Sequence, residues 1–230
     1  GALFLGGPDI PPVMYNEATH LLTSVTDPYR HYLEASFIFH LLGGYHDPSW
    51  LAWMRSKDHY LISGICLGMQ TMNVATGGTM IQDIPSEVYG VWTAEEILDM
   101  PPDQMHRNYN DMLETDCAQP TSYHFHQVEI IKGSFLQKGL KFKSKMPPLV
   151  LSSHHQAIES PGMAWRIAAT SMDGKIIEAI EHEHYPHVFG VQFHPEKPGL
   201  FDPQIVHPLS CKEQISFQEV IKDSHSFTFH

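Results

Sequence analysis

The sequence has few cysteines, and they are far apart. Cys66, Cys117 and Cys211 are the three that it contains. Their odd number and wide spacing predict neither a framework of disulfides nor a Cys-x-x-Cys metal site. This favours a reducing compartment, and we expect a cytoplasmic protein in which Cys117 and Cys211 are chemically inert.

Basic residues and long apolar runs are also scarce. Lys and Arg number 14 against 26 Asp and Glu, which gives a net charge of −12 at pH 7. Nucleic acids and anionic membranes attract basic surfaces, so neither is an expected partner. No apolar run reaches the roughly 18 residues that a membrane-spanning helix requires. No repeat or linker divides the chain, and residues 1–230 are expected to form one domain.

The pattern of apolar residues predicts alternating strands and helices. A strand at 2–6, helices at 27–42 and 47–58, a strand at 59–65 and a helix at 67–78 follow one another. This order is typical of an α/β fold with a mostly parallel central sheet flanked by helices. We expect a loop with one short helix at 90–120, further strands at 123–131, 147–153, 164–171, 175–182 and 187–194, and a closing helix at 212–223.

Cys66 lies between two glycines in the stretch GICLG, directly after an apolar strand. A nucleophile on a sharp turn from strand to helix needs such small neighbours. The start of the following helix would favour the thiolate, and the backbone N–H of Leu67 would face an oxyanion. A merely packed cysteine after a strand gives the same pattern more often, so this motif alone does not decide.

Two other strand ends carry complementary groups. In GVQFHPE, His194 and Glu196 project to the same side of an extended chain, where a carboxylate orients an imidazole base. In FLGGPD, two glycines after a strand allow the backbone N–H of Gly7 to approach a substrate closely. A surface turn and an ordinary strand end are the plainer interpretations. The co-occurrence of nucleophile, base and oxyanion donors favours a catalytic site.

These stretches resemble class I glutamine amidotransferases, and most closely the gamma-glutamyl-gamma-aminobutyrate hydrolase group. The matching text runs in the family's order from Gly6 to Glu196: GGPDIPP, GICLGMQTMNVATGGTMIQD, HQVEIIKGS, SSHHQAIES, DGKIIEAIEH and GVQFHPE. The family has further strand–helix units before the GGPD strand. Since Gly1 is not an initiator residue, we expect that upstream residues, N-terminal strands included, are missing from this numbering.

The resemblance implies a flavodoxin-like fold and hydrolysis of a gamma-glutamyl amide through a thioester, with no metal and no cofactor. By this resemblance Cys66 would be the nucleophile, His194 the base and Glu196 the carboxylate that orients it. Gly7 and Leu67 would donate hydrogen bonds to the oxyanion, and the substrate would be bound by Gln70, Ser153 and His154. The partner would be a small gamma-glutamyl molecule, and a homodimer is possible for this fold. Two alternatives stay open, a glutaminase subunit of an amidotransferase and a non-catalytic interaction protein.

The 17 histidines of the chain fall into local clusters that admit a second interpretation. His182 and His184 would share a strand face, as metal ligands do, but we favour a solvated strand end. His124 and His126 are likewise expected to be a pair on a strand face rather than ligands. Of His154 and the adjacent His155, we expect one to line the pocket and one to be structural.

Overall fold

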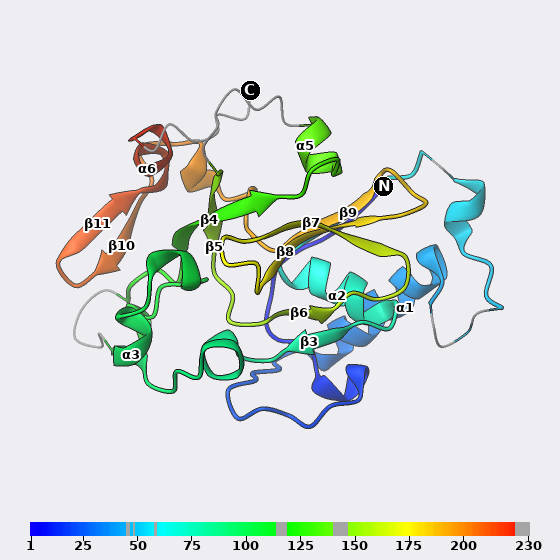
Figure 1. The fold of residues 1–230 in the computed structure, drawn as a ribbon, viewed down its shortest axis with the longest axis horizontal. Helices are drawn as coiled ribbons and strands as arrows, with labels where there is room; N and C mark the ends of the chain where they lie inside the picture. Colours follow the sequence, from blue (N-terminus) through cyan, green and yellow to red (C-terminus); the bar gives the residue numbers. More distant parts are fainter. Residues whose placement is uncertain (45–46, 48, 58, 114–118, 140–146, 224–230) are drawn as a thin grey trace.

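The structure, a computed structural model, describes residues 1–44, 47, 49–57, 59–113, 119–139 and 147–223 (Figure 1). A mixed, nine-stranded sheet forms the centre of the described part, in the order β1-β2-β9-β8-β7-β4-β5, with β6 pairing both β8 and β3. Its strands are β1 Ala2–Phe4, β2 Ile62–Ile65, β3 Thr79–Ile81, β4 His124–Ile130, β5 Leu149–Ser152, β6 Ala157–Ser160, β7 Trp165–Ser171, β8 Ile177–His182 and β9 Val188–Val191.

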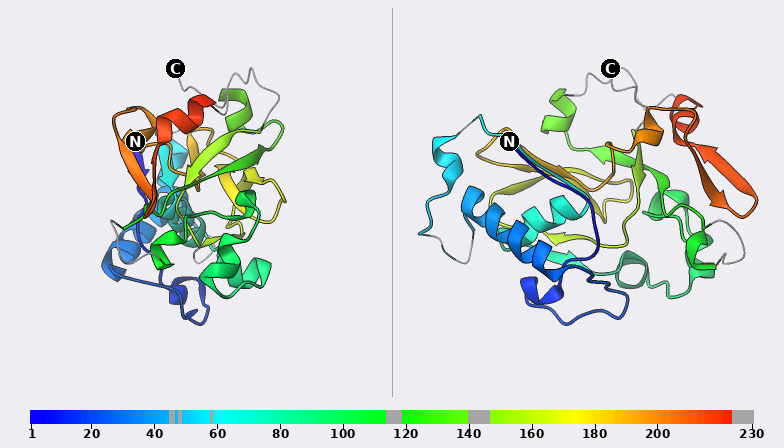
Figure 2. Two further views of the ribbon diagram at one scale, coloured as in Figure 1. Left: turned by 90° about the vertical axis from the view of Figure 1, so that its left-hand side faces the viewer. Right: turned by 180° about the vertical axis from the view of Figure 1, so that it is seen from behind.

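Helices flank this sheet, and a separate hairpin stands beside it (Figures 1 and 2). The helices are α1 Pro28–Leu42, α2 Leu67–Ala75, α3 Ala94–Leu98, α4 Asn110–Leu113, α5 Phe135–Gly139 and α6 Phe217–Asp223. The hairpin pairs β10 Val206–Ser210 with β11 Glu213–Ser216, and single turns of 3₁₀- or π-helix occur at Pro12–Tyr15, Trp53–Ser56, Pro85–Tyr89, Pro102–Gln104 and Pro198–Leu200. No helix of the described residues is long and apolar enough to cross a membrane.

The α/β class with helices flanking a central sheet is confirmed, but the sheet is mixed rather than mostly parallel. Strand β2 pairs in parallel with β1 and β9. The pairs β9–β8, β8–β7, β7–β4 and β4–β5 are antiparallel. Short turns join β7 to β8 and β8 to β9, and a turn of a few residues cannot make the crossover that parallel strands require.

Several expected elements have different bounds. The strands β3 and β6 were not predicted, and each is only three or four residues long. The helix expected at 212–223 begins only at Phe217, because Glu213–Ser216 pairs with β10. The helix expected at 47–58 is reduced to the 3₁₀ turn Trp53–Ser56. The segment 90–120 holds two short α-helices instead of one, and its residues 114–118 lie outside the described part.

The two long helices form as their sequences require. The Asp27 carboxylate accepts a hydrogen bond from the Arg30 N–H and caps α1, Pro28 opens it, and Gly43 ends it at φ +77°. All nine residues of α2 are buried, because α2 packs on β1, β2 and β9 and is covered by α1. Leu67, the first residue of α2, belongs to the main core, while Cys66 packs in a second apolar cluster with Ile65 and Val191.

Candidate active site

Cys66 occupies the sharp turn between β2 and α2, as the sequence predicts. Its backbone has φ +53° and ψ −112°, a region that residues other than glycine rarely adopt. Such strain costs about 1–3 kcal/mol and is found mainly at functional sites. The turn is possible because its flanks are glycines: a Cβ on Gly64 would lie 2.5 Å from the carbonyl carbon of Gly68, and one on Gly68 would overlap the carbonyl of Phe4.

The Cys66 thiol is buried, and its protonation differs from the expectation. Burial raises the pKa of the thiol to about 12, the negative charges of Glu196 and Glu178 add to this rise, and the hydrogen bond from the Leu67 N–H opposes it. The Leu67 N–H at the helix start thus favours the thiolate, as expected, but burial outweighs it in this resting state. At neutral pH the sulfur is protonated, so it needs a base at the moment of attack.

The His194–Glu196 pair follows β9, the strand beside β2. His194 Nδ1 lies 2.8 Å from Glu196 Oε1, and since a carboxylate only accepts, Nδ1 carries the proton and Nε2 has a free lone pair. Burial raises the pKa of Glu196, but the hydrogen bond from His194 and the charge of Lys197 outweigh it and hold this pKa below its usual value. Glu196 is therefore ionised and orients the imidazole.

Gly6 lies where the nucleophile and the base approach each other. A Cβ added to Gly6 would be 2.8 Å from His194 Cε1 and 3.7 Å from Cys66 Cβ. The parallel strands β1, β2 and β9 end at the same edge of the sheet, which brings these three residues together although 188 positions separate Gly6 from His194 (194 − 6). The structure thus places Cys66 and His194 next to Gly6.

Arg30 holds the predicted oxyanion segment, and the sequence analysis missed it. Its guanidinium donates hydrogen bonds to the carbonyls of Leu5, at 2.8 Å, and Gly6, at 3.2 Å, while its Nε is 2.8 Å from Glu34 Oε1. In a trans peptide the N–H of Gly7 points away from the carbonyl of Gly6. Arg30 therefore fixes the direction of the Gly7 N–H. A basic residue in the first turn of a helix gave no sign of this, because the contact depends on tertiary structure.

Lys197 and Tyr123 complete the surroundings of the base. Lys197 Nζ is 3.6 Å from Glu196 Oε1 and 5.1 Å from the centre of the Tyr123 ring. The Tyr123 ring meets the His194 ring edge-on at 5.6 Å between centroids. Lys197 directly follows the HPE motif, and this adjacency was the available signal for its position.

The three predicted substrate-binding residues occupy different settings. Gln70 is buried, and its amide donates to the Gln156 carbonyl and the Gln192 side chain. The Ser153 hydroxyl donates to Ser122 Oγ at 2.7 Å. The His154 ring is buried and faces Glu178. Their contact with a substrate stays a prediction.

A cavity of about 550 Å³ also borders His194. It is lined mainly by apolar side chains of β2, β4, β5 and β9, and Cys66 is not part of its lining. A gamma-glutamyl group carries an amine and a carboxylate, which this apolar lining does not match. The geometry around Cys66 and Gly6, rather than this cavity, therefore defines the candidate active site.

The remaining histidine and cysteine predictions are mixed in outcome. The solvated strand end expected for His182 and His184 holds for His184, which is exposed, but is wrong for His182, which is buried against Trp165 at the end of β8. The His124 ring donates to the Pro102 carbonyl, while His126 is fully buried. Cys211 is disulfide-bonded, which the number and spacing of the cysteines did not indicate, because distance along the chain does not limit pairing in space. Cys117 lies outside the described residues.

Comparison with known proteins shows the family of the chain. The sequence profile of the family described as Peptidase C26 matches residues 52–196, more than half of the chain. Protein NtpR of Enterococcus hirae is 30% identical over 211 residues, which cover 87% of this chain and 71% of that protein. A protein of Mycobacterium tuberculosis named as a glutamine amidotransferase, Rv2859c, is 30% identical over 84% of this chain and 49% of its own length.

A protein of Lactococcus lactis named as glutamine amidotransferase-like, YvdE, is 28% identical, with 83% of this chain and 63% of its own length covered. A solved glutamine amidotransferase from Thermotoga maritima matches 87% of this chain and 60% of its own at 14% identity and a TM-score of 0.41, a likeness on which nothing below depends. The chain thus spans 49% to 71% of the length of these three relatives.

The chain belongs to the Peptidase C26 family, within the class I glutamine amidotransferase-like proteins. This family is of hydrolase type.

Proposed function

We propose that the protein hydrolyses the gamma-glutamyl amide bond of a small gamma-glutamyl amine, such as gamma-glutamyl-gamma-aminobutyrate, with Cys66, His194 and Glu196 as its catalytic triad. The observation that carries this proposal is the meeting of a strained, buried cysteine and a carboxylate-oriented histidine on the two sides of Gly6. The motifs that resemble the gamma-glutamyl-gamma-aminobutyrate hydrolase group support the substrate class.

The proposed reaction has two steps. His194 Nε2 takes the thiol proton as the Cys66 sulfur attacks the gamma-carbonyl carbon, and the N–H groups of Leu67 and Gly7 stabilise the oxyanion. The amine leaves with the proton from His194, and a thioester remains. Water, deprotonated by His194, then attacks the thioester and releases glutamate and the thiol. Neither step requires a metal or an organic cofactor.

Glutamate release from a panel of gamma-glutamyl amides, glutamine included, tests the proposal. The native-length protein is compared with Cys66→Ala and with Ser63→Ala, a control on the same strand. Turnover of gamma-glutamyl amines well above glutamine, lost only in Cys66→Ala, is the expected result. Turnover that survives in Cys66→Ala would exclude Cys66 as the nucleophile.

A glutaminase subunit is the second candidate. It is favoured by the CTP synthase of Methylorubrum populi, which is 30% identical over 158 residues covering 64% of this chain and 28% of that protein. Hydrolysis of glutamine alone, dependent on an added synthetase partner, would favour this function. A protein that binds but does not hydrolyse these amides would be a non-catalytic member of the family.

Surroundings and assembly belong to the proposal too. A small gamma-glutamyl molecule is the proposed ligand, and neither nucleic acid nor membrane is a proposed partner, since the chain carries a net charge of −12. A homodimer would be shown by light scattering of the purified protein. The cytoplasm is not supported as the location, because disulfides such as that of Cys211 persist mainly in oxidising compartments.

A further inference from the structure

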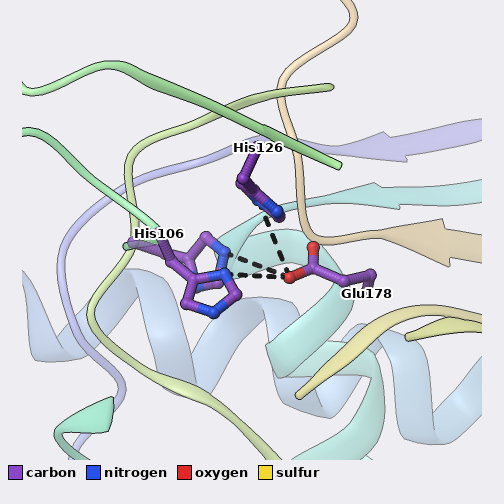
Figure 3. A group of neighbouring side chains, drawn as sticks. His106, His126 and Glu178 are labelled. Atoms are coloured by element: carbon purple, nitrogen blue, oxygen red, sulfur yellow. Dashed lines mark ion pairs between the residues drawn. The ribbon is translucent and has the colours of Figure 1, made fainter. Parts of the chain in front are cut away.

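Three histidines and a glutamate meet in the interior, away from the surface and apart from the proposed triad. His106 follows the 3₁₀ turn Pro102–Gln104, His126 lies on β4, His154 lies between β5 and β6, and Glu178 lies on β8. Each has 4% or less of its surface exposed. One ligand atom from each of the four lies within 4.8 Å of the others, and Figure 3 shows His106 and His126 turned toward the Glu178 carboxylate.

The lone pairs of two of these imidazoles point at a carboxylate. His154 Nδ1 is 2.8 Å from the Gln156 carbonyl, and His126 Nδ1 is 3.2 Å from the Gln127 carbonyl. Since carbonyls only accept, both Nδ1 atoms carry the proton and both Nε2 atoms present lone pairs. These Nε2 atoms lie 3.9 Å and 3.8 Å from Glu178 Oε1. Acceptors that face an anionic acceptor repel one another unless a cation lies between them.

The Glu178 carboxylate has no hydrogen-bond donor among the described residues. Both of its oxygens are buried without a hydrogen bond, and so are His154 Nε2 and both ring nitrogens of His106. His106 Nδ1 is 3.1 Å from Glu178 Oε1, but it is not aligned for a hydrogen bond. A buried carboxylate without a partner costs several kcal/mol. Its isolation at the centre of three imidazoles is therefore the feature to be explained.

We propose that His106, His126, His154 and Glu178 bind one divalent cation, with zinc as the preferred metal. Zinc takes four nitrogen and oxygen ligands tetrahedrally at about 2.0–2.1 Å, which places neighbouring ligand atoms about 3.3 Å apart. The three nitrogens lie 3.1, 3.8 and 3.9 Å from Glu178 Oε1, so small side-chain movements complete the sphere. The carbonyls that hold the Nδ1 protons of His126 and His154 are the outer partners that zinc-bound histidines use.

One protein group competes for the site. The Ser152 hydroxyl lies 2.9 Å from His126 Nε2 and donates to the lone pair that the metal would take. Metal binding replaces this hydrogen bond. Because four protein ligands fill a tetrahedral sphere, the site has a structural character. It ties the segment around His106 to β4, β8 and the turn between β5 and β6, and it revises the expectation that His126 is not a ligand.

The chain offers a matched control for the test. His31 on α1 is also fully buried, and neither of its ring nitrogens has a hydrogen-bond partner in the described part of the chain. Its replacement removes a buried imidazole at a different place. His31→Gln thus reports what the loss of a buried histidine alone does, while Glu178→Gln and His126→Gln remove proposed ligands.

Metal binding is measured directly, without reference to activity. The full chain is stripped with a chelator and titrated with Zn²⁺ by calorimetry, and with Co²⁺ by absorption in the visible range. The wild type and His31→Gln are expected to bind one ion per chain, with the intense bands of tetrahedral Co²⁺, and to melt at a higher temperature with Zn²⁺. Glu178→Gln and His126→Gln are expected to bind about 100-fold more weakly or worse.

Ser152→Ala keeps the test decisive if the ligand variants do not fold. It leaves all four ligands in place and removes the competing donor, so it should bind Zn²⁺ at least as tightly as the wild type. Folded wild-type protein that binds no stoichiometric Zn²⁺ or Co²⁺ would overturn the proposal. Equal Zn²⁺ affinity in the wild type and in a folded Glu178→Gln would overturn it as well. Because no readout involves hydrolysis, this outcome is separate from that of the proposed function.

Discussion

His194 and Glu196 form a hydrogen-bonded pair, with Nδ1 and Oε1 2.8 Å apart, on a segment only three residues long. Pro195 between them restricts the backbone, so the pair is held by local geometry as well as by the hydrogen bond. The imidazole therefore keeps one tautomer and one orientation, with Nε2 available to the rest of the site.

Replacement of Glu196 by Gln should lower the rate of gamma-glutamyl amide hydrolysis by about 10²–10⁴-fold, because the amide no longer stabilises the imidazolium that forms during attack. The measurement is kcat for glutamate release, with circular dichroism to establish that the variant is folded. Glu183→Gln, an exposed change in the turn after β8, should leave kcat as it is. A Glu196→Gln protein with full activity would remove Glu196 from the mechanism.

Arg30→Gln should lower kcat by about tenfold with little change in KM. The guanidinium no longer holds the carbonyls of Leu5 and Gly6, so the N–H of Gly7 loses its fixed direction toward the oxyanion, which forms only in the transition state. Steady-state kinetics separates the two constants. A rise in KM at constant kcat would instead place Arg30 in substrate binding.

Gly68→Ala should destabilise the fold by about 3 kcal/mol or more, since its Cβ would overlap the carbonyl of Phe4, which belongs to the backbone of β1 and cannot turn aside. Urea unfolding measures the free energy. Gly139→Ala is the control, because a Cβ at Gly139 meets no atom within 4 Å. If the two variants are equally stable, the close approach of β1 and α2 is looser than described.

His155 should make stability depend on pH in the alkaline range. Burial lowers the pKa of His155, but its hydrogen bonds to Asp83, at 3.1 Å, and Asp9, at 3.2 Å, outweigh this and raise it to about 9. A folded-state pKa above the usual 6.5 means that the ionic contribution is complete below pH 6.5 and is lost as pH rises through about 9.

Urea unfolding of the wild type and of His155→Gln across pH 6 to 10 measures this dependence. At pH 6 the variant should be less stable by about 1–3 kcal/mol, the size of a charged hydrogen bond of limited exposure. The difference should shrink toward pH 10. A difference that is constant over this range would show that His155 contributes through packing rather than charge.

The local features of the site could be predicted from the sequence. Gly64 and Gly68 indicated the sharp turn at Cys66, and the two-residue spacing of His194 and Glu196 indicated their pairing. Both features depend on residues that are neighbours in the chain. The glycines at 6 and 7 marked a close approach of backbone for the same reason. The α/β class, although not the mixed strand directions of the sheet, followed from the alternation of strand and helix patterns in the first third of the chain.

Features that depend on distant segments could not be predicted. The antiparallel direction of β8 is an exception, because the short turns on both sides of it indicated this direction and only the parallel pattern of the first third of the chain was extended to it. The pKa of Cys66 is raised mainly by burial, which outweighs the lowering effect of the Leu67 N–H at the helix start. His106 lies in an irregular stretch, 20 residues before His126 and 72 before Glu178 (126 − 106; 178 − 106). The spacing of these residues in the sequence therefore did not indicate that they form a cluster with His154.

The position of Gly6 has a consequence for engineering. Gly6 is not among the glycines with a positive φ, so its backbone conformation is also open to alanine. The methyl group of an alanine at this position would enter the space between the His194 imidazole and Cys66. Folding and turnover thus respond to different parts of this short segment. Gly6→Ala would therefore block the site with one methyl group and give a folded, inactive protein that keeps all of its reactive side chains.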